Sequence, residues 1–81
     1  KRGEALRAGE QAQQMLLQAL QEGDTTVRAL AAASLGQLGR ADTIRALYAA
    51  LRDGREEVRM VAHAALADLQ LQIGQPLPSA V

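Results

Sequence analysis

The sequence contains no cysteine, tryptophan or phenylalanine, and Tyr48 is its only aromatic residue. The absence of cysteine excludes disulfide bonds, thiolate metal sites and a cysteine nucleophile. The formal net charge is zero and evenly spread, because residues 1–40 carry five basic and four acidic side chains and residues 41–81 carry four and five. Nucleic acids and anionic membranes are bound by clustered basic charge, so neither is expected as a partner.

Long apolar runs are also lacking. No stretch approaches the roughly 18 consecutive apolar residues that a membrane-spanning helix needs, so we expect no membrane insertion. No secretory signal peptide is visible at the start, and the expected location is therefore cytoplasmic. What is abundant is alanine and leucine, with 17 and 13 residues in a chain of 81. A chain of this length forms one domain, with a core of small and medium aliphatic side chains.

The chain contains an internal repeat. A shift of 31 positions makes ten of the 24 positions from Leu16 to Gly39 identical. The identities fall at the positions that decide structure: Leu16/Leu47, Ala19/Ala50, Leu20/Leu51, Gly23/Gly54, Val27/Val58, Arg28/Arg59, Ala31/Ala62, Ala33/Ala64, Leu35/Leu66 and Leu38/Leu69. Each unit is predicted to be a helix, a glycine turn and a second helix that begins near Val-Arg.

The spacing of apolar residues predicts four helices and no strands. Apolar side chains recur at i, i+3, i+4 and i+7, as on one face of a helix, and nothing alternates with period two. The predicted helices cover residues 10–22, 25–38, 42–52 and 55–73. Residues 1–9 are either the end of an earlier helix, cut at Gly9, or an extension of the first helix. Residues 74–81 are predicted to be extended, because Pro76 and Pro78 cannot continue a helix.

The residues between these helices fit helix ends. Gly23, Gly39 and Gly54 stand where left-handed C-caps are expected. Asp24 and Asp42 stand where an N-cap oxygen is expected. Arg55 replaces Asp24 in the second unit, which leaves Asp53 as the candidate cap there.

The two second helices resemble those of short HEAT-like repeats of the phycobilisome-lyase type. The strings that carry the resemblance are Asp24-Thr-Thr-Val-Arg-Ala-Leu-Ala-Ala-Ala-Ser-Leu-Gly36 and Val58-Arg-Met-Val-Ala-His-Ala-Ala-Leu-Ala67, with Leu51-Arg-Asp53 and Gly39-Arg-Ala-Asp42 as turns. The resemblance implies an all-α fold, an α-α superhelix of two helix-pair repeats at residues 10–39 and 40–73. Residues 1–9 are then an uncertain segment or the end of a preceding repeat. The departures from the pattern are Arg55 for an acid, His63 for a small alanine and Ala67 for glycine.

The resemblance also implies roles for the two repeated arginines. In HEAT repeats such an arginine pairs with an acid at the turn and ties neighbouring repeats together. The candidate acids for Arg28 and Arg59 are Glu22, Asp24 and Asp53. The alternative is that these arginines bind phosphate or a substrate. Because a partly buried pair needs the planar guanidinium, Arg59→Lys is expected to lower the melting temperature.

A second candidate site is the face formed by the second helices. In solenoids these helices line the concave surface where partners dock. The candidate contact residues are Thr25, Ala29 and Ala32 in the first unit and Glu56, Met60 and His63 in the second. The alternative is that His63 is merely exposed, or packs on a neighbouring repeat.

No pattern in the sequence indicates catalysis, a cofactor or a metal. The positions one helical turn from His63 hold Arg59 and Ala67, neither of which binds metal. The iron-binding His-Glu of HEAT-like deoxyhypusine hydroxylases is replaced by Ala29-Leu30 and Met60-Val61. The stretch Gly36-Gln-Leu-Gly39 has neither the preceding strand nor the Lys-Ser/Thr of a phosphate loop.

The leading hypothesis is therefore a non-catalytic protein–protein interaction module, a scaffold or adaptor. Its partner is expected to be another protein, further repeats of the same chain or a second copy. The alternative is a subunit of a bilin lyase-like enzyme that acts on a phycobiliprotein, as some relatives do. DNA binding, as in HEAT-like alkylpurine glycosylases, is disfavoured because a basic concave surface with aromatic residues is missing.

Overall fold

The computed structural model describes residues 2–74, and those residues form helices joined by short turns. The helices are α1 (Arg2–Glu22), α2 (Thr25–Leu38), α3 (Ile44–Ala50) and α4 (Glu56–Ile73), and a single 3-10 turn, η1 (Ala41–Thr43), precedes α3. The predicted all-α fold is confirmed, and no strand occurs in this part of the chain. The predicted extended tail, beyond Gly74, lies outside the described residues.

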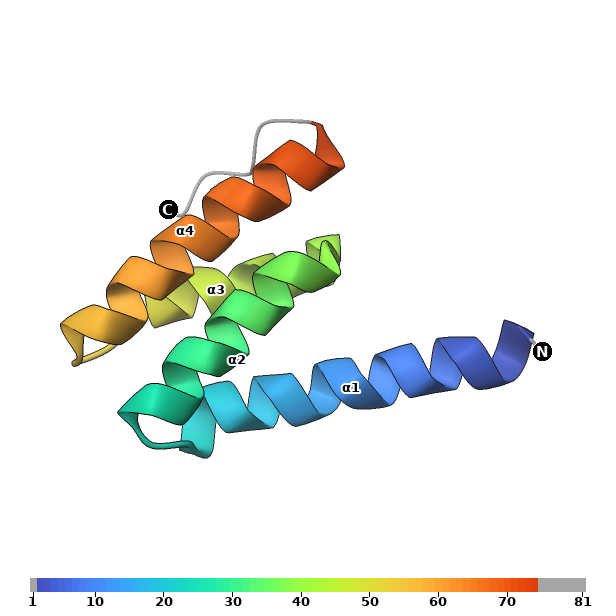
Figure 1. Cartoon of the computed structure of the whole chain (residues 1–81), viewed down its shortest axis with the longest axis horizontal. Helices are drawn as coiled ribbons and strands as arrows, with labels where there is room; N and C mark the ends of the chain where they lie inside the picture. The colour runs from blue at the N-terminus through green and yellow to red at the C-terminus, as the bar shows by residue number, and fades with distance from the viewer. Residues whose placement is uncertain (1, 75–81) are drawn as a thin grey trace.

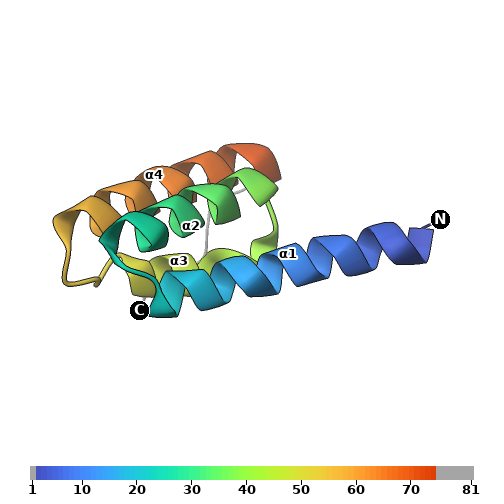
Figure 2. The same cartoon turned by 60° about the horizontal axis from the view of Figure 1, so that its bottom comes forward.

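The helices lie in two layers, with α1 and α3 in one and α2 and α4 in the other (Figure 2). Each helix pair is an antiparallel hairpin, and α2 and α4 run side by side in the same direction (Figure 1). The second hairpin is thus a displaced copy of the first. The most extensive contact between helices joins α2 to α4, and α2 also packs on α1 and α4 on α3.

Two helix boundaries differ from the spacing-based prediction. Helix α1 continues through Gly9 back to Arg2, which is the extension alternative for residues 1–9. One glycine in a helix costs about 1 kcal/mol, and the Glu, Ala, Leu and Arg residues around it favour helix. Helix α3 is shorter than predicted, because residues 41–43 form the 3-10 turn.

The predicted helix caps are partly confirmed. Asp24 caps α2, since its Oδ1 accepts the Val27 N–H at 2.9 Å. Asp42 is not an N-cap: it lies inside η1 and its carboxylate is 3.7 Å from Arg40 Nε. The Thr43 hydroxyl instead donates to the Arg40 carbonyl at 2.7 Å. Asp53 does not cap α4 by side-chain bonds to its first turn, because its Oδ1 accepts the N–H of Arg55, which precedes the helix.

The prediction of left-handed glycines was right at one of three positions. Gly39 ends α2 with a φ of 68°, and Gly74 ends α4 with a φ of 74°. These two are the positive-φ glycines of the described residues, so the prediction was wrong for Gly23 and Gly54. Gly23 is required by space instead, because a Cβ there would lie 2.7 Å from the Ala19 carbonyl oxygen.

One hydrophobic core runs through both hairpins. Its largest fully buried aliphatic side chains are Leu35 of α2, Leu47 of α3, and Val58 and Leu69 of α4. Leu20 of α1 joins the same cluster. Because each hairpin supplies only part of this core, the two stabilise each other.

Candidate functional site

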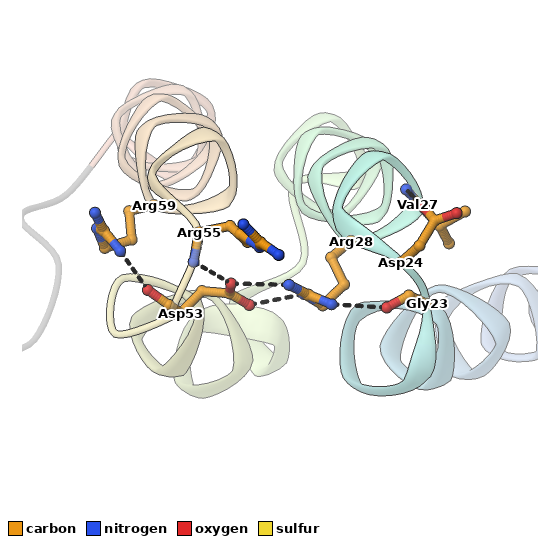
Figure 3. A network of polar contacts seen from close by, with 7 residues as sticks. All are labelled: Gly23, Asp24, Val27, Arg28, Asp53, Arg55 and Arg59. Atoms are coloured by element: carbon orange, nitrogen blue, oxygen red, sulfur yellow. Dashed lines mark hydrogen bonds and ion pairs between the residues drawn. The ribbon is translucent and has the colours of Figure 1, made fainter.

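Arg28 connects the turn of the first helix pair, at Gly23, with the turn of the second helix pair, at Asp53. Its Nε and Nη2 donate to the two carboxylate oxygens of Asp53 at 2.9 and 3.1 Å, and its Nη1 donates to the Gly23 carbonyl at 2.8 Å (Figure 3). Of the three acids considered from the sequence, Asp53 is the one whose carboxylate the Arg28 guanidinium binds. The planar fork of arginine fits a carboxylate with two parallel bonds, so this pair fixes the second hairpin on the first.

Asp53 is the hub of this network. Besides Arg28, its Oδ1 accepts the Arg55 N–H at 2.9 Å, and its carbonyl accepts from Arg59 Nη1 at 2.6 Å. The hydrogen bond from Arg28 and the Arg55 N–H hold the pKa of Asp53 below its usual value, because both favour the charged carboxylate. Asp24 takes no part in the network, since its side chain caps α2.

Arg59 is placed differently from Arg28, its counterpart one repeat earlier. The one hydrogen bond of its side chain among the described residues goes to the Asp53 carbonyl, and no carboxylate there accepts from its Nε or Nη2. Arg59 is half-buried. The two arginines that the sequence grouped together therefore have unequal partners.

The six predicted contact residues on the second helices do not form one surface. Ala32 is fully buried, which corrects its assignment to a partner-binding face. The same face of α2 packs against α4, and at Gly36 an added Cβ would lie 2.7 Å from Ala65 Cβ. Thr25 and Ala29, on this face, are half-buried. The matching residues of α4, Glu56, Met60 and His63, are exposed.

A different surface spans both second helices. A shallow groove runs between α2 and α4. It is lined by Ala33 and Gln37 of α2 and by Val61, Ala64, Ala65, Ala67, Asp68 and Leu71 of α4. Leu71 is 81% exposed. This groove was not predicted from the sequence, although the Ala33/Ala64 identity lies at two of its lining residues.

The described residues do not suggest a metal site or a membrane span. They bring together no group of three His, Asp or Glu side chains suited to hold a metal ion. None of the helices within residues 2–74 combines the length and the hydropathy needed to cross a bilayer.

The comparison with protein families identifies the repeat. The family model for HEAT repeats matches residues 6–80, almost the whole chain. The chain belongs to the HEAT repeat family. HEAT repeats generally mediate protein–protein interactions. Neither a curated protein nor a solved structure matches this HEAT-repeat chain significantly. The finer resemblance to phycobilisome-lyase-type repeats stays a prediction.

Proposed function

We propose that this HEAT-repeat chain is a non-catalytic scaffold or adaptor, and that it binds a helix of a partner protein in the α2–α4 groove. The observation that carries the proposal is Leu71, a large aliphatic side chain that is 81% exposed beside alanine-lined walls. Large apolar side chains gathered in a groove with a polar rim are typical of protein-binding surfaces.

The groove also limits what its partner can be. Its walls are the small side chains of Ala33 and Ala64, so an apolar stripe of a helix can approach closely. Asp68 lies on the rim and is exposed, which favours a Lys or Arg beside that stripe. Met60, 65% exposed on α4, adds an adaptable apolar contact nearby.

The test uses a photo-crosslinking residue at Ala64, with Ala12 on α1 as the matched control position. Both alanines are exposed, but only Ala64 lines the groove. The partner captured from position 64 and not from position 12 is then purified, and its affinity for variants is measured. Leu71→Asp is expected to weaken binding about tenfold or more. The neighbouring Gln70→Asp, which adds the same charge outside the groove, is the control. Equal affinities for the two variants would contradict the proposal.

The alternative function, a bilin lyase-like subunit, is favoured by no contact among the described residues. A new absorbance band on mixing the purified chain with a bilin would restore it. We expect the bilin spectrum to stay unchanged.

A further inference from the structure

Four of the six exposed large apolar side chains of the described residues lie at one end of the stack. Met15, Val27, Leu30 and Leu38 are 71%, 40%, 63% and 40% exposed. Their counterparts one repeat later lie between the two hairpins: Val58 and Leu69 are fully buried, and Ala46 and Val61 are half-buried against the core. Together with Glu22, the four exposed residues form what we term the head face. The equivalent residues of the second repeat form the surface that packs on the first repeat.

The opposite end of the stack has the matching surface, which we term the tail face. It consists of Arg52, Arg59, Met60, His63 and Ala67, of which all but Arg59 are exposed. One repeat earlier, three counterparts of these residues lie at the contact with the second repeat. Arg28 binds Asp53, Ala32 is fully buried and Gly36 lies against Ala65. Within the chain, the surface of repeat 1 that corresponds to the tail face therefore packs on the surface of repeat 2 that corresponds to the head face.

We propose that the head face of one copy of the chain docks on the tail face of a second copy, in the arrangement that joins the two repeats within one chain. The proposal does not rest on the proposed function, although the tail face adjoins the α2–α4 groove and shares Ala67 with it. Because head and tail faces differ, the contact is heterologous and leads to open chains of copies.

The charges at the two faces match the internal pair. Asp53, which holds Arg28, has Glu22 as its counterpart 31 residues earlier. Glu22 is exposed, and its side chain makes no hydrogen bond or ion pair within the described part of the chain. Docking in the internal arrangement brings Glu22 of one copy to Arg59 of the next, whose Nε and Nη2 donate to no carboxylate within residues 2–74. This Glu22–Arg59 pair would repeat the Asp53–Arg28 bridge between copies.

The tail face also departs from the internal interface at two positions. The close approach of α2 to α4 depends on Gly36, and its counterpart Ala67 carries a Cβ. His63 stands where the first repeat has the fully buried Ala32. Both changes add bulk, so the two copies lie farther apart than the two repeats do. We therefore expect reversible association that grows with concentration, weaker than the joining of the repeats.

Sedimentation velocity of the full chain from about 10 μM to about 1 mM tests the proposal. The wild-type chain is expected to form larger species as the concentration rises. Glu22→Arg and Arg59→Glu are each expected to stay monomeric, because like charges then meet at every contact. An equimolar mixture of the two variants should associate again, since every contact between unlike copies pairs an arginine with a glutamate.

Further variants separate this proposal from misfolding and from the groove. Leu30→Asp, at a side chain that is 63% exposed, should abolish association while the helical circular dichroism stays unchanged. Leu71→Asp in the groove should leave association intact. The double change His63→Ala and Ala67→Gly, which copies the internal interface, should strengthen it by roughly tenfold. A wild-type chain that stays monomeric up to 1 mM would overturn the proposal and leave both faces to another protein. So would association that Leu30→Asp and the charge reversals do not change.

Discussion

At the scale of single residues, the bond between the repeats is concentrated in Arg28. Three of its guanidinium nitrogens bind two carboxylate oxygens of Asp53 and the Gly23 carbonyl. The Arg28 and Asp53 side chains are 22% and 15% exposed, so water competes weakly for these bonds. Arg59, with one bond to a carbonyl, is expected to stabilise the folded chain less.

Replacing Arg28 by lysine tests this bond. A lysine ammonium cannot make the bidentate contact with Asp53 and reach Gly23 as well, so Arg28→Lys is expected to lower the free energy of unfolding by about 1–2 kcal/mol. Arg59→Lys is expected to cost less than half of that. Arg45→Lys, at an exposed position of α3, is the control and should change nothing measurable. Thermal unfolding followed by circular dichroism measures all three. Equal melting temperatures for Arg28→Lys and Arg45→Lys would show that the stability of the chain does not depend on this bridge.

The lowered pKa of Asp53 predicts a stability loss in acid. The pKa in the unfolded chain is about 3.9, and the folded chain holds it lower through Arg28 and the Arg55 N–H. The charged carboxylate therefore stabilises the fold above about pH 4, and this contribution is lost as the pH falls through the folded pKa. Urea unfolding from pH 6 to pH 2 should show a steeper decline for wild type than for Asp53→Asn. Parallel curves would show that Asp53 does not carry this dependence.

At the scale of elements, the contact of α2 with α4 depends on small side chains. Ala32 is fully buried, and an added Cβ at Gly36 would lie 2.7 Å from Ala65 Cβ and 2.8 Å from its Cα. Real side-chain carbons are not found so close, so α2 and α4 can approach as they do only because position 36 is glycine.

Gly36→Ala is therefore expected to destabilise the fold. Helix propensity alone would favour alanine by up to about 1 kcal/mol, but forcing two packed helices apart costs typically 1–3 kcal/mol. We expect a net loss near 1–2 kcal/mol in chemical denaturation. Gly54→Ala is the matched control, since a Cβ at Gly54 meets nothing within 4 Å and its φ is not positive. That variant should be neutral or slightly more stable. If the Gly36→Ala variant were more stable than wild type, the space between α2 and α4 would have to accommodate a Cβ at position 36.

At the scale of the whole molecule, stability comes from a core that neither hairpin completes. Leu35 of the first repeat and Leu47 and Leu69 of the second are fully buried in one cluster. Repeats of this kind bury their apolar faces on their neighbours, so the two hairpins are expected to unfold together.

Two half-chain peptides test this dependence. Residues 1–40 and residues 41–81 each contain one hairpin, and each exposes the face that the other covers. Each peptide alone is expected to have little helical circular dichroism, because short helices are marginal in water without tertiary packing. The full chain is expected to unfold in one cooperative step. A half peptide with a cooperative transition of its own would show that one hairpin is a sufficient folding unit.

The helices and the repeat could be predicted from the amino-acid sequence alone. Apolar spacing is a local property, so it located all four helices and the 31-residue relation between them. Asp24 as an N-cap and Gly39 as a left-handed C-cap were also readable, because each acts within one turn of its own helix.

Which copy of each repeated face is covered depends on how the helices pack in three dimensions. Ala32 and His63 are equivalent in the repeat, yet Ala32 is fully buried and His63 is exposed, because a helix lies beside α2 on that side and none of the described residues lies beside α4 there. The choice of Asp53 over Glu22 and Asp24 as the partner of Arg28 has the same cause. Burial and pairing depend on which elements are neighbours in space, and two segments with the same local pattern need not have the same neighbours.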